Sequence, residues 1–273
     1  MNDATLQAQI DAATAYQEFF VPALFQQWAP RVIAAAQIQP GYRVLDVACG
    51  TGVLAREAAS HLGSTGSVVG LDPNPGMLAV AARLAPAIEW RQGTAESLPY
   101  PDQSFDVVLS QFGLMFFTDR RQALREMLRI LAPGGHLAVA VWDSLDNTPA
   151  YAAAVALLER IAGQRAADAL RAPFALGDRK ELTTLLGSAG AASVAITTHT
   201  GTARFPSARS MVEADLRGWL PVMGVVLTEE QIHRILADAE SALGRYVTAE
   251  GRVVFDSPAH IITGTRPFAV LRW

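Results

Sequence analysis

The sequence predicts an α/β fold in which a mostly parallel β-sheet is covered by helices on both faces. Between residues 41 and 143, short apolar and β-branched runs alternate with stretches of helical periodicity, which is typical of βα units. The chain has 273 residues, of which 51% are hydrophobic, and its mean hydropathy is +0.21. These values exclude a disordered chain and predict a large core in one or two domains, at roughly 150 residues per domain.

The alternating region contains strands and helices in regular succession. The predicted strands span residues 43–47, 67–71, 88–91, 105–110 and 136–142, and the predicted helices span 53–62, 76–84 and 120–131. The last helix shows the pattern clearly, because Ala123, Leu124 and Met127 fall on one face and arginines on another. Asp119 is suited to its N-cap, and the Pro-Gly-Gly sequence at 133–135 ends it.

The remaining chain follows a different pattern. After residue 149 we expect helices at 151–170 and 179–187, a strand at 192–205, helices at 208–223 and 229–246, and a final strand around 260–265. The two late strands complete the sheet at its edge. This divides the chain into an N-terminal helical segment (1–40), a ligand-binding core (41–145) and a region (146–273) that completes the sheet and carries a helical cap at about 206–250.

Charge and cysteine content narrow the function. The 22 Lys and Arg against 26 Asp and Glu give a net charge of −4, with no basic run, which argues against a nucleic-acid partner. The single cysteine, Cys49, cannot form an internal disulfide, and the N-terminus lacks the pattern of a signal peptide. No apolar stretch is typical of a membrane span, and no His, Asp or Glu cluster has metal-ligand spacing. We therefore expect a cytoplasmic protein without a metal site.

The most informative segment is VLDVACGTG at residues 44–52, a buried strand that runs into a glycine-rich turn and then a helix. Such a turn allows a ligand to approach the backbone closely at the carboxyl end of the strand. Residues 50–55 match a relaxed dinucleotide fingerprint, and Asp72 follows at the distance expected of a ribose-binding acid. Taken alone, the match leaves a NAD(P)-dependent oxidoreductase open.

Three neighbouring features favour a different ligand. Asp46 lies four residues before Gly50, and Ala48 and Cys49 lengthen the loop, which suits a ligand with an amino-acid portion and no pyrophosphate. Residues 71–77 (LDPNPGM) form a turn into the next helix. The third feature is QGTAESLPYPDQSFDVV at residues 92–108.

With these motifs in order across residues 41–142, the sequence resembles the class I S-adenosylmethionine (SAM) dependent methyltransferases, in the group that includes the ubiquinone/menaquinone biosynthesis C-methyltransferases. The turn at residues 129–135 and the Tyr16/Phe20 stretch are similar too. The resemblance implies a Rossmann-like fold with a seven-stranded, mostly parallel sheet, SAM as cofactor and S-adenosylhomocysteine as product. A non-catalytic SAM-binding protein remains an alternative.

The resemblance also implies roles for particular residues. Ala48 and Gly50 would bind the methionine end through backbone atoms, Asp46 would support the loop or hold the ammonium through water, and Asp72 would accept both ribose hydroxyls. Family members commonly carry Asp where this chain has Thr94. The complete set of expected cofactor-binding residues is Tyr16, Asp46, Ala48, Gly50, Thr51, Gly52, Asp72, Pro73, Met77, Thr94, Ala95, Glu96 and Gln111.

The acceptor site is less legible. Residues 110–113 (SQFG) lack the Asn/Asp-Pro-Pro-aromatic motif of DNA and protein-glutamine amino-methyltransferases, which favours O- or C-methylation of a small, apolar or aromatic metabolite. Candidate acceptor-binding residues are Phe20, Phe112, Phe116, Tyr151, Trp219 and Met223, all of which could equally be core. No catalytic residue is assigned, although His199 and His260 are candidate bases. Either a monomer or a homodimer is expected.

Overall fold

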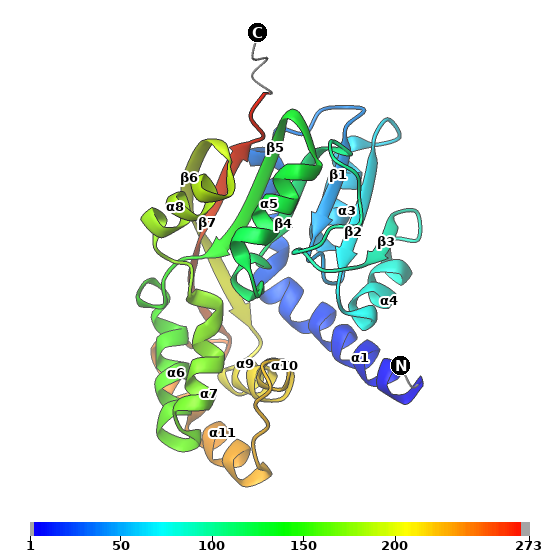
Figure 1. Cartoon of the computed structure of the whole chain (residues 1–273). Coiled ribbons are helices and arrows are strands. Elements are labelled where there is room, and N and C mark those ends of the chain that lie inside the picture. The colour runs from blue at the N-terminus through cyan, green and yellow to red at the C-terminus, as the bar shows by residue number, and fades with distance from the viewer. Residues whose placement is uncertain (1–2, 269–273) are drawn as a thin grey trace.

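A seven-stranded sheet organises the protein, whose computed structural model describes residues 3–268 (Figure 1). The strand order is β3-β2-β1-β4-β5-β7-β6. The first five pair in parallel, and β7 runs antiparallel to both β5 and β6, which confirms the predicted mostly parallel sheet. The strands are β1 (Arg43–Val47), β2 (Ser67–Asp72), β3 (Glu89–Gln92), β4 (Phe105–Gln111), β5 (Leu131–Trp142), β6 (Ala192–Phe205) and β7 (Val253–Thr265).

Helices cover both faces of the sheet, as the sequence predicts. From β1 the chain steps to β2 through α3 (Val53–Leu62), whereas from β4 it steps the opposite way to β5 through α5 (Arg120–Ile130). Because such crossovers are right-handed, the two helices lie on opposite faces. Helix α2 (Ala29–Ala36) packs beside α3, and α8 (Arg179–Ala189) beside α5. The reversal of direction leaves a crevice at the carboxyl ends of β1 and β4.

The central strands are apolar because they are covered on both sides. Residues 137–141 of β5 have no exposed surface, which accounts for their uninterrupted apolar sequence. Helix α5 begins at the predicted N-cap, where the Asp119 carboxylate accepts a hydrogen bond from the Gln122 N–H at 2.9 Å. Among the described residues, no helix is long and apolar enough to cross a membrane.

Two elements differ from those predicted. The helix expected at 151–170 is divided into α6 (Pro149–Ala162) and α7 (Gln164–Arg171), because Gly163 adopts a φ of 85° that no helix can continue through. The final strand, expected around 260–265, already begins at Val253. It pairs with β6 over its whole length, from Val253 opposite Phe205 to Thr265 opposite Ala192.

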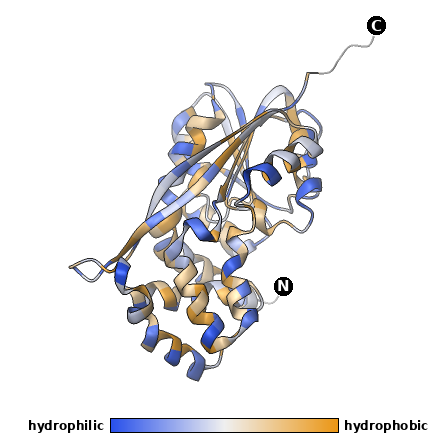
Figure 2. Cartoon of the chain, turned by 90° about the vertical axis from the view of Figure 1, so that its left-hand side faces the viewer, coloured by the Kyte–Doolittle hydropathy of each residue, from blue (hydrophilic) through white to orange (hydrophobic). Residues whose placement is uncertain are grey.

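The cap is larger than the sequence indicates. Helices α9 (Ala208–Ala214), α10 (Leu220–Val222) and α11 (Glu229–Leu243), with the π-helical segment η6 (Asp215–Trp219), connect β6 to β7. Helix α11 also packs against α6, and α10 against α7, so α6 and α7 belong to the cap (Figure 1). Hydrophobic and hydrophilic residues alternate along these helices in Figure 2, which gives each an apolar side to bury.

The N-terminal helical segment lies at the same end of the sheet as the cap (Figure 1). It is a continuous run of α1 (Asp3–Ala15), the π-helical segment η1 (Tyr16–Phe25), a short 3₁₀ turn η2 (Gln26–Trp28) and α2. Helix α1 packs against α4 (Pro75–Leu84). The approach is close enough that a Cβ added at Gly76 would lie 2.4 Å from the Gln9 backbone.

Replacing Gly76 with alanine should therefore push α1 away from α4. We expect Gly76→Ala to lower the free energy of unfolding by about 1–3 kcal/mol, as measured by urea denaturation. Gly187→Ala in α8 is the matched control, because an added Cβ there meets nothing within 4 Å. The control should be neutral or stabilising by up to ~1 kcal/mol. Equal denaturation midpoints for the two variants would contradict the close contact.

Candidate active site

The loop after β1 holds a tightly turned backbone at the crevice. Ala48, Gly50 and Gly52 all have positive φ angles, of 59°, 54° and 81°. The Cys49 N–H donates to the Leu71 carbonyl at 3.0 Å, and the Gly52 N–H donates to the Cys49 carbonyl at 2.8 Å. For the non-glycine Ala48 the left-handed conformation costs roughly 1–2 kcal/mol, a kind of strain that is concentrated at functional sites.

Trp90, on β3, packs over two glycines of this region. A Cβ at either Gly52 or Gly70 would lie 2.3 Å from the Trp90 ring, and its Nε1 donates to the Ala85 carbonyl at 3.0 Å. Side chains at these positions would displace the ring. At Gly50, by contrast, an added Cβ would meet nothing within 4 Å, so that side of the loop is open to a ligand.

Asp72 connects the end of β2 to the glycine loop. Its Oδ2 accepts from the Gly50 N–H at 2.9 Å and its Oδ1 from the Asn74 N–H at 2.8 Å, and the side chain is almost fully buried. Burial raises the pKa of Asp72, while these two N–H groups lower it. An ionised carboxylate offers about four acceptor sites, so the group can also take hydrogen bonds from a ligand.

Asp46 lies at the end of β1 and is 1% exposed. Neither of its oxygens makes a well-aligned hydrogen bond with a described residue. Burial raises its pKa well above the ordinary value, the Ala55 N–H opposes this rise, and the nearby Asp72 carboxylate adds to it. Burial and the same two carboxylates also raise the pKa of Tyr16, so its ring lies near the pair. A bound cation would relieve this electrostatic cost.

A cavity of about 670 Å³ reaches this region through Tyr16, Asn74 and Met77. Its walls come from α1, η1, the ends of β4 and β5, and the cap. Phe112 and Trp142 form a stacked pair in it, with ring centroids 3.8 Å apart and an interplanar angle of 13°. Phe112 has a φ of 56°, which is uncommon for a bulky side chain and indicates that the surroundings force this orientation.

The cavity unites most of the predicted acceptor residues. Its lining includes Tyr16, Phe20, Met77, Phe112, Phe116, Tyr151 and Trp219. Met223 is packed against the core and is outside this lining. Lining residues that sequence reasoning missed are Phe25, Trp142, Asp215 and Ser257. Trp142 could have been found, since it ends a predicted strand at the ligand-binding edge, whereas Asp215 lies unmarked inside a predicted helix.

Several predicted cofactor residues also have local structural partners. Thr51 donates its hydroxyl hydrogen to the Gln17 Oε1 at 2.7 Å, and the Pro73 carbonyl accepts from the Gln92 side chain at 3.0 Å. Gln111 donates from Nε2 to the Phe25 carbonyl at 3.2 Å, and its Oε1 is buried without a hydrogen-bond partner among the described residues.

Of the residues expected near the adenine, Thr94 is exposed and Ala95 is buried. Glu96 accepts from the Thr118 N–H at 2.9 Å, so its carboxylate already has a structural use.

The two histidines named as candidate bases lie outside the cavity lining. His260 is 2% exposed, with Nδ1 2.9 Å from the Thr198 hydroxyl and Nε2 2.9 Å from the Gly177 carbonyl. His199 pairs with Ala259 on the β6–β7 ribbon. A general base must lie within hydrogen-bond distance of the proton that it removes, whatever its pKa. Neither histidine is placed to accept a proton from a molecule in the cavity.

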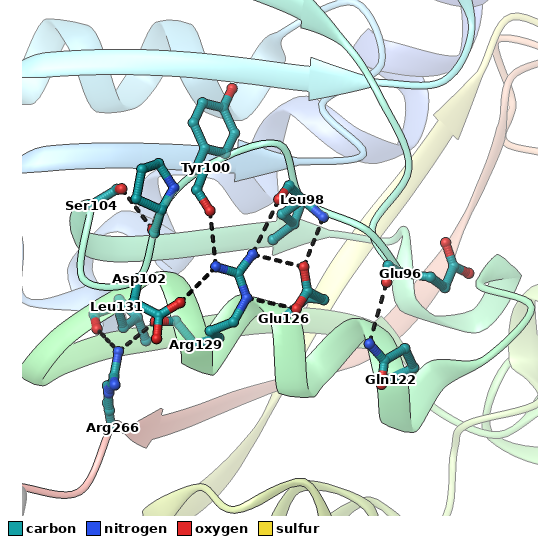
Figure 3. A network of polar contacts seen from close by, with 11 residues as sticks. Glu96, Leu98, Tyr100, Asp102, Ser104, Gln122, Glu126, Arg129, Leu131 and Arg266 are labelled. Atoms are coloured by element: carbon teal, nitrogen blue, oxygen red, sulfur yellow. Dashed lines mark hydrogen bonds and ion pairs between the residues drawn. The ribbon is translucent and has the colours of Figure 1, made fainter.

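Arg129 secures the loop that carries Thr94 and Ala95 (Figure 3). Its guanidinium donates to Glu126 at 2.7 and 2.8 Å, to Asp102 at 2.9 Å, and to the carbonyls of Tyr100 and Leu98 at 2.9 and 3.1 Å. Glu126 in turn accepts from the Leu98 N–H at 2.9 Å. Helix α5 thus holds residues 98–102 through the Arg129 guanidinium and the Glu126 carboxylate.

Comparison with known proteins identifies the central region. Residues 45–139 match the family model described as a methyltransferase domain. Over 130 residues the chain is 45% identical to the ubiquinone/menaquinone biosynthesis C-methyltransferase UbiE of Ectopseudomonas mendocina. This central region is therefore similar to a methyltransferase domain. The alignment covers 45% of this chain and 51% of that relative, so the chain spans about half the length of the curated relatives it matches.

Solved structures resemble the chain in fold. The YcgJ protein from Bacillus subtilis superposes with a TM-score of 0.59 at 21% identity, covering 88% of this chain and 98% of that one. The [4+2]-cyclase SpnF superposes with a TM-score of 0.54 at 21% identity, covering 90% and 82%. Because a cyclase is among them, the fold alone does not decide the reaction.

Removing the Arg129 side chain should loosen residues 98–102. We expect Arg129→Met to lower the free energy of unfolding by roughly 2–4 kcal/mol in urea denaturation at neutral pH, because charged hydrogen bonds are lost. Arg125→Met, at an exposed position on the same helix, should change it by less than about 0.5 kcal/mol.

The pH dependence of this difference follows from Glu126. Hydrogen bonding to Arg129 lowers the pKa of Glu126, so its contribution to stability is complete above the ordinary value of 4.5 and is lost as the pH falls through the lowered value. The gap between wild type and Arg129→Met should therefore shrink on acidification below that range. If the difference in free energy of unfolding stayed constant, the proposed contribution of the Arg129–Glu126 pair would be contradicted.

Proposed function

We propose that the protein transfers a methyl group from SAM to a carbon or oxygen of a small, apolar or aromatic acceptor, with S-adenosylhomocysteine as the product. The observation that carries this proposal is the aromatic cavity, whose lining residue Tyr16 lies near the two buried acids beside the glycine loop. The family match favours SAM over the nicotinamide cofactor of the oxidoreductase alternative.

The loop residues fit the methionine and ribose portions of SAM. Gly50 leaves open space beside the backbone, and the unpartnered oxygens of Asp46 suit an ammonium group, directly or through water. Asp72 would accept both ribose hydroxyls while it keeps its bond from the Gly50 N–H. Thr94 and Ala95 would border the adenine. Met77, at the start of α4, would border it as well.

When bound, SAM supplies an electrophilic methyl group on a sulfonium. The chain's task is then to orient the acceptor, exclude water and surround the positive charge. Phe112 and Trp142 lie at the carboxyl ends of β4 and β5, and an aromatic ring facing a cation contributes about 0.5–2 kcal/mol. Holding two reactants in line can supply effective molarities of ~10⁵ M or more, so positioning suffices as the main source of catalysis.

The acceptor class is suggested by the relatives and the cavity together. The printed name of the UbiE relatives describes C-methylation in ubiquinone and menaquinone biosynthesis. By analogy, a quinol-type or phenolic ring is the acceptor that we propose here, and the aromatic lining supports it. The net charge of −4 opposes a polyanionic substrate. We place the reaction in the cytoplasm, as expected from the sequence.

Methyl-labelled SAM tests the proposal directly. The protein is incubated with labelled SAM and a panel of phenols and quinols, and label is measured in the organic extract. Transfer to a panel member is expected. Stabilisation by NADH, with none by SAM or S-adenosylhomocysteine, would refute the proposal in favour of the oxidoreductase alternative. Tight SAM binding without any transfer would favour the non-catalytic alternative.

Asp72→Asn should weaken SAM binding while preserving side-chain shape. A neutral amide accepts hydrogen bonds less strongly than a carboxylate, so we expect the dissociation constant in calorimetry to rise roughly ten- to a hundredfold. Asp146→Asn, at an exposed position beyond the cavity lining, is the matched control and should leave it unchanged. If Asp72→Asn bound SAM as tightly as wild type, Asp72 would not bind the ribose hydroxyls.

SAM binding should release protons. Asp46 keeps its proton at pH values above the ordinary carboxyl pKa of 3.8, because burial and Asp72 raise its pKa, and an ammonium group would favour the ionised form. SAM affinity should therefore increase with pH until Asp46 is ionised in the free protein. Calorimetry in two buffers of different ionisation enthalpy counts the protons. If Asp46→Asn released as many protons as wild type on binding SAM, this account would be contradicted.

A further inference from the structure

Asp215 is a buried acidic residue in the lining of a largely apolar cavity. It is 3% exposed, it belongs to the lining, and its Oδ2 is buried without a hydrogen-bond partner among the described residues. Most of the neighbouring lining residues are aromatic or aliphatic. Burying an ionised carboxyl group without a partner costs several kcal/mol, and burying it in its neutral form still costs about 1–3 kcal/mol. Packing alone therefore does not account for an acid at this position.

The local backbone gives Asp215 an unusual setting. It is the first residue of the π-helical segment η6, which interrupts the helix between α9 and α10. The other π-helical segment of the described chain, η1, lines the same cavity. The two segments also meet, since a Cβ at Gly218 of η6 would lie 3.4 Å from the Phe20 ring of η1. Such bulges are rare and occur frequently at functional sites.

Two further buried polar side chains line the same cavity from separate elements. Tyr151 comes from α6 and is 6% exposed, and Ser257 comes from β7 and is 2% exposed; both line the cavity. Burial and the neighbouring Asp215 carboxylate raise the pKa of the Tyr151 hydroxyl. Burial also raises the pKa of Asp215 well above its ordinary value, so the neutral acid can both donate and accept a hydrogen bond.

We propose that Asp215 recognises a hydroxyl group on an apolar, aromatic acceptor, with Tyr151 and Ser257 completing the polar end of the site. The aromatic wall of Phe112 and Trp142 would hold the ring system. The inference rests on the proposed function, because it assigns this cavity to the methyl acceptor. It adds the feature that an acceptor must have: a hydroxyl group that reaches the cap, on a skeleton that is otherwise apolar.

A matched pair of ligands tests the assignment. 1-Naphthol and 1-methoxynaphthalene share an aromatic skeleton, but only the first has a hydroxyl hydrogen to donate. We expect the full-length protein, saturated with S-adenosylhomocysteine, to bind naphthol at least about tenfold more tightly than the ether in calorimetry. The reason is that the ether has no hydroxyl hydrogen to donate to the Asp215 carboxyl group. A wild-type protein without this preference would overturn the proposal.

Two variants assign the preference to Asp215. Asp215→Leu should bind both ligands with similar affinity, whereas Asp215→Asn, whose amide still accepts a hydrogen bond, should keep a preference for naphthol. Asp238→Leu is the matched control, since Asp238 lies on cap helix α11, outside the lining, in an exposed ion pair with Arg160. It should keep the wild-type ratio. A wild-type ratio in Asp215→Leu would overturn the proposal.

The design separates this proposal from the proposed function. Asp215→Leu should be at least as stable as wild type in thermal denaturation, because it replaces an unpartnered carboxyl group with an apolar side chain. If it fails to fold, Asp215→Ala provides the apolar comparison. SAM affinity should be unchanged in all variants. If wild type does not bind SAM, the proposed function fails, while the naphthol-to-ether ratio measured without cofactor still supports or overturns the role of Asp215.

Discussion

The burial of Asp46 and Asp72 beside the glycine loop is the constraint on which the rest of the site depends. Both acids stand at carboxyl ends of neighbouring parallel strands, where the pairing of β1 with β2 brings them together. Asp72 is satisfied by two backbone N–H groups, whereas Asp46 lacks well-aligned partners. The folded chain therefore contains two carboxyl groups that water barely reaches, and a cationic ligand would favour their ionised forms.

Packing around Asp46 and Asp72 closes the crevice. Trp90 covers the rear of the glycine loop, and Tyr16 lies near the acids from η1. Helix α1 stays close to α4 because Gly76 has no side chain. Together these contacts pack side chains and helices around the two acids, and the proposed transfer from a sulfonium would require such a limit on the access of water.

Under the proposed function, acceptor choice would belong to a different part of the molecule. The long antiparallel ribbon of β6 and β7 carries the cap, and α6, η6 and β7 each bring a buried polar side chain to a largely apolar cavity. These elements lie outside residues 45–139, the part that matches the methyltransferase family. Similarity in the core therefore informs the chemistry, and under the proposed function the cap would select the acceptor, in keeping with function residing in sites added to a common fold.

The sequence by itself determined the sheet, the glycine loop and the positions of Asp46 and Asp72, because local periodicity and the carboxyl-end rule specify them. Tertiary structure alone decided the break at Gly163, the early start of β7 at Val253 and the burial of Asp215. It also occupied both ring nitrogens of His260 with structural contacts. The reason is physical: strand and loop motifs are encoded by neighbours in sequence, whereas a cavity and a side chain's partners arise only where distant segments pack together.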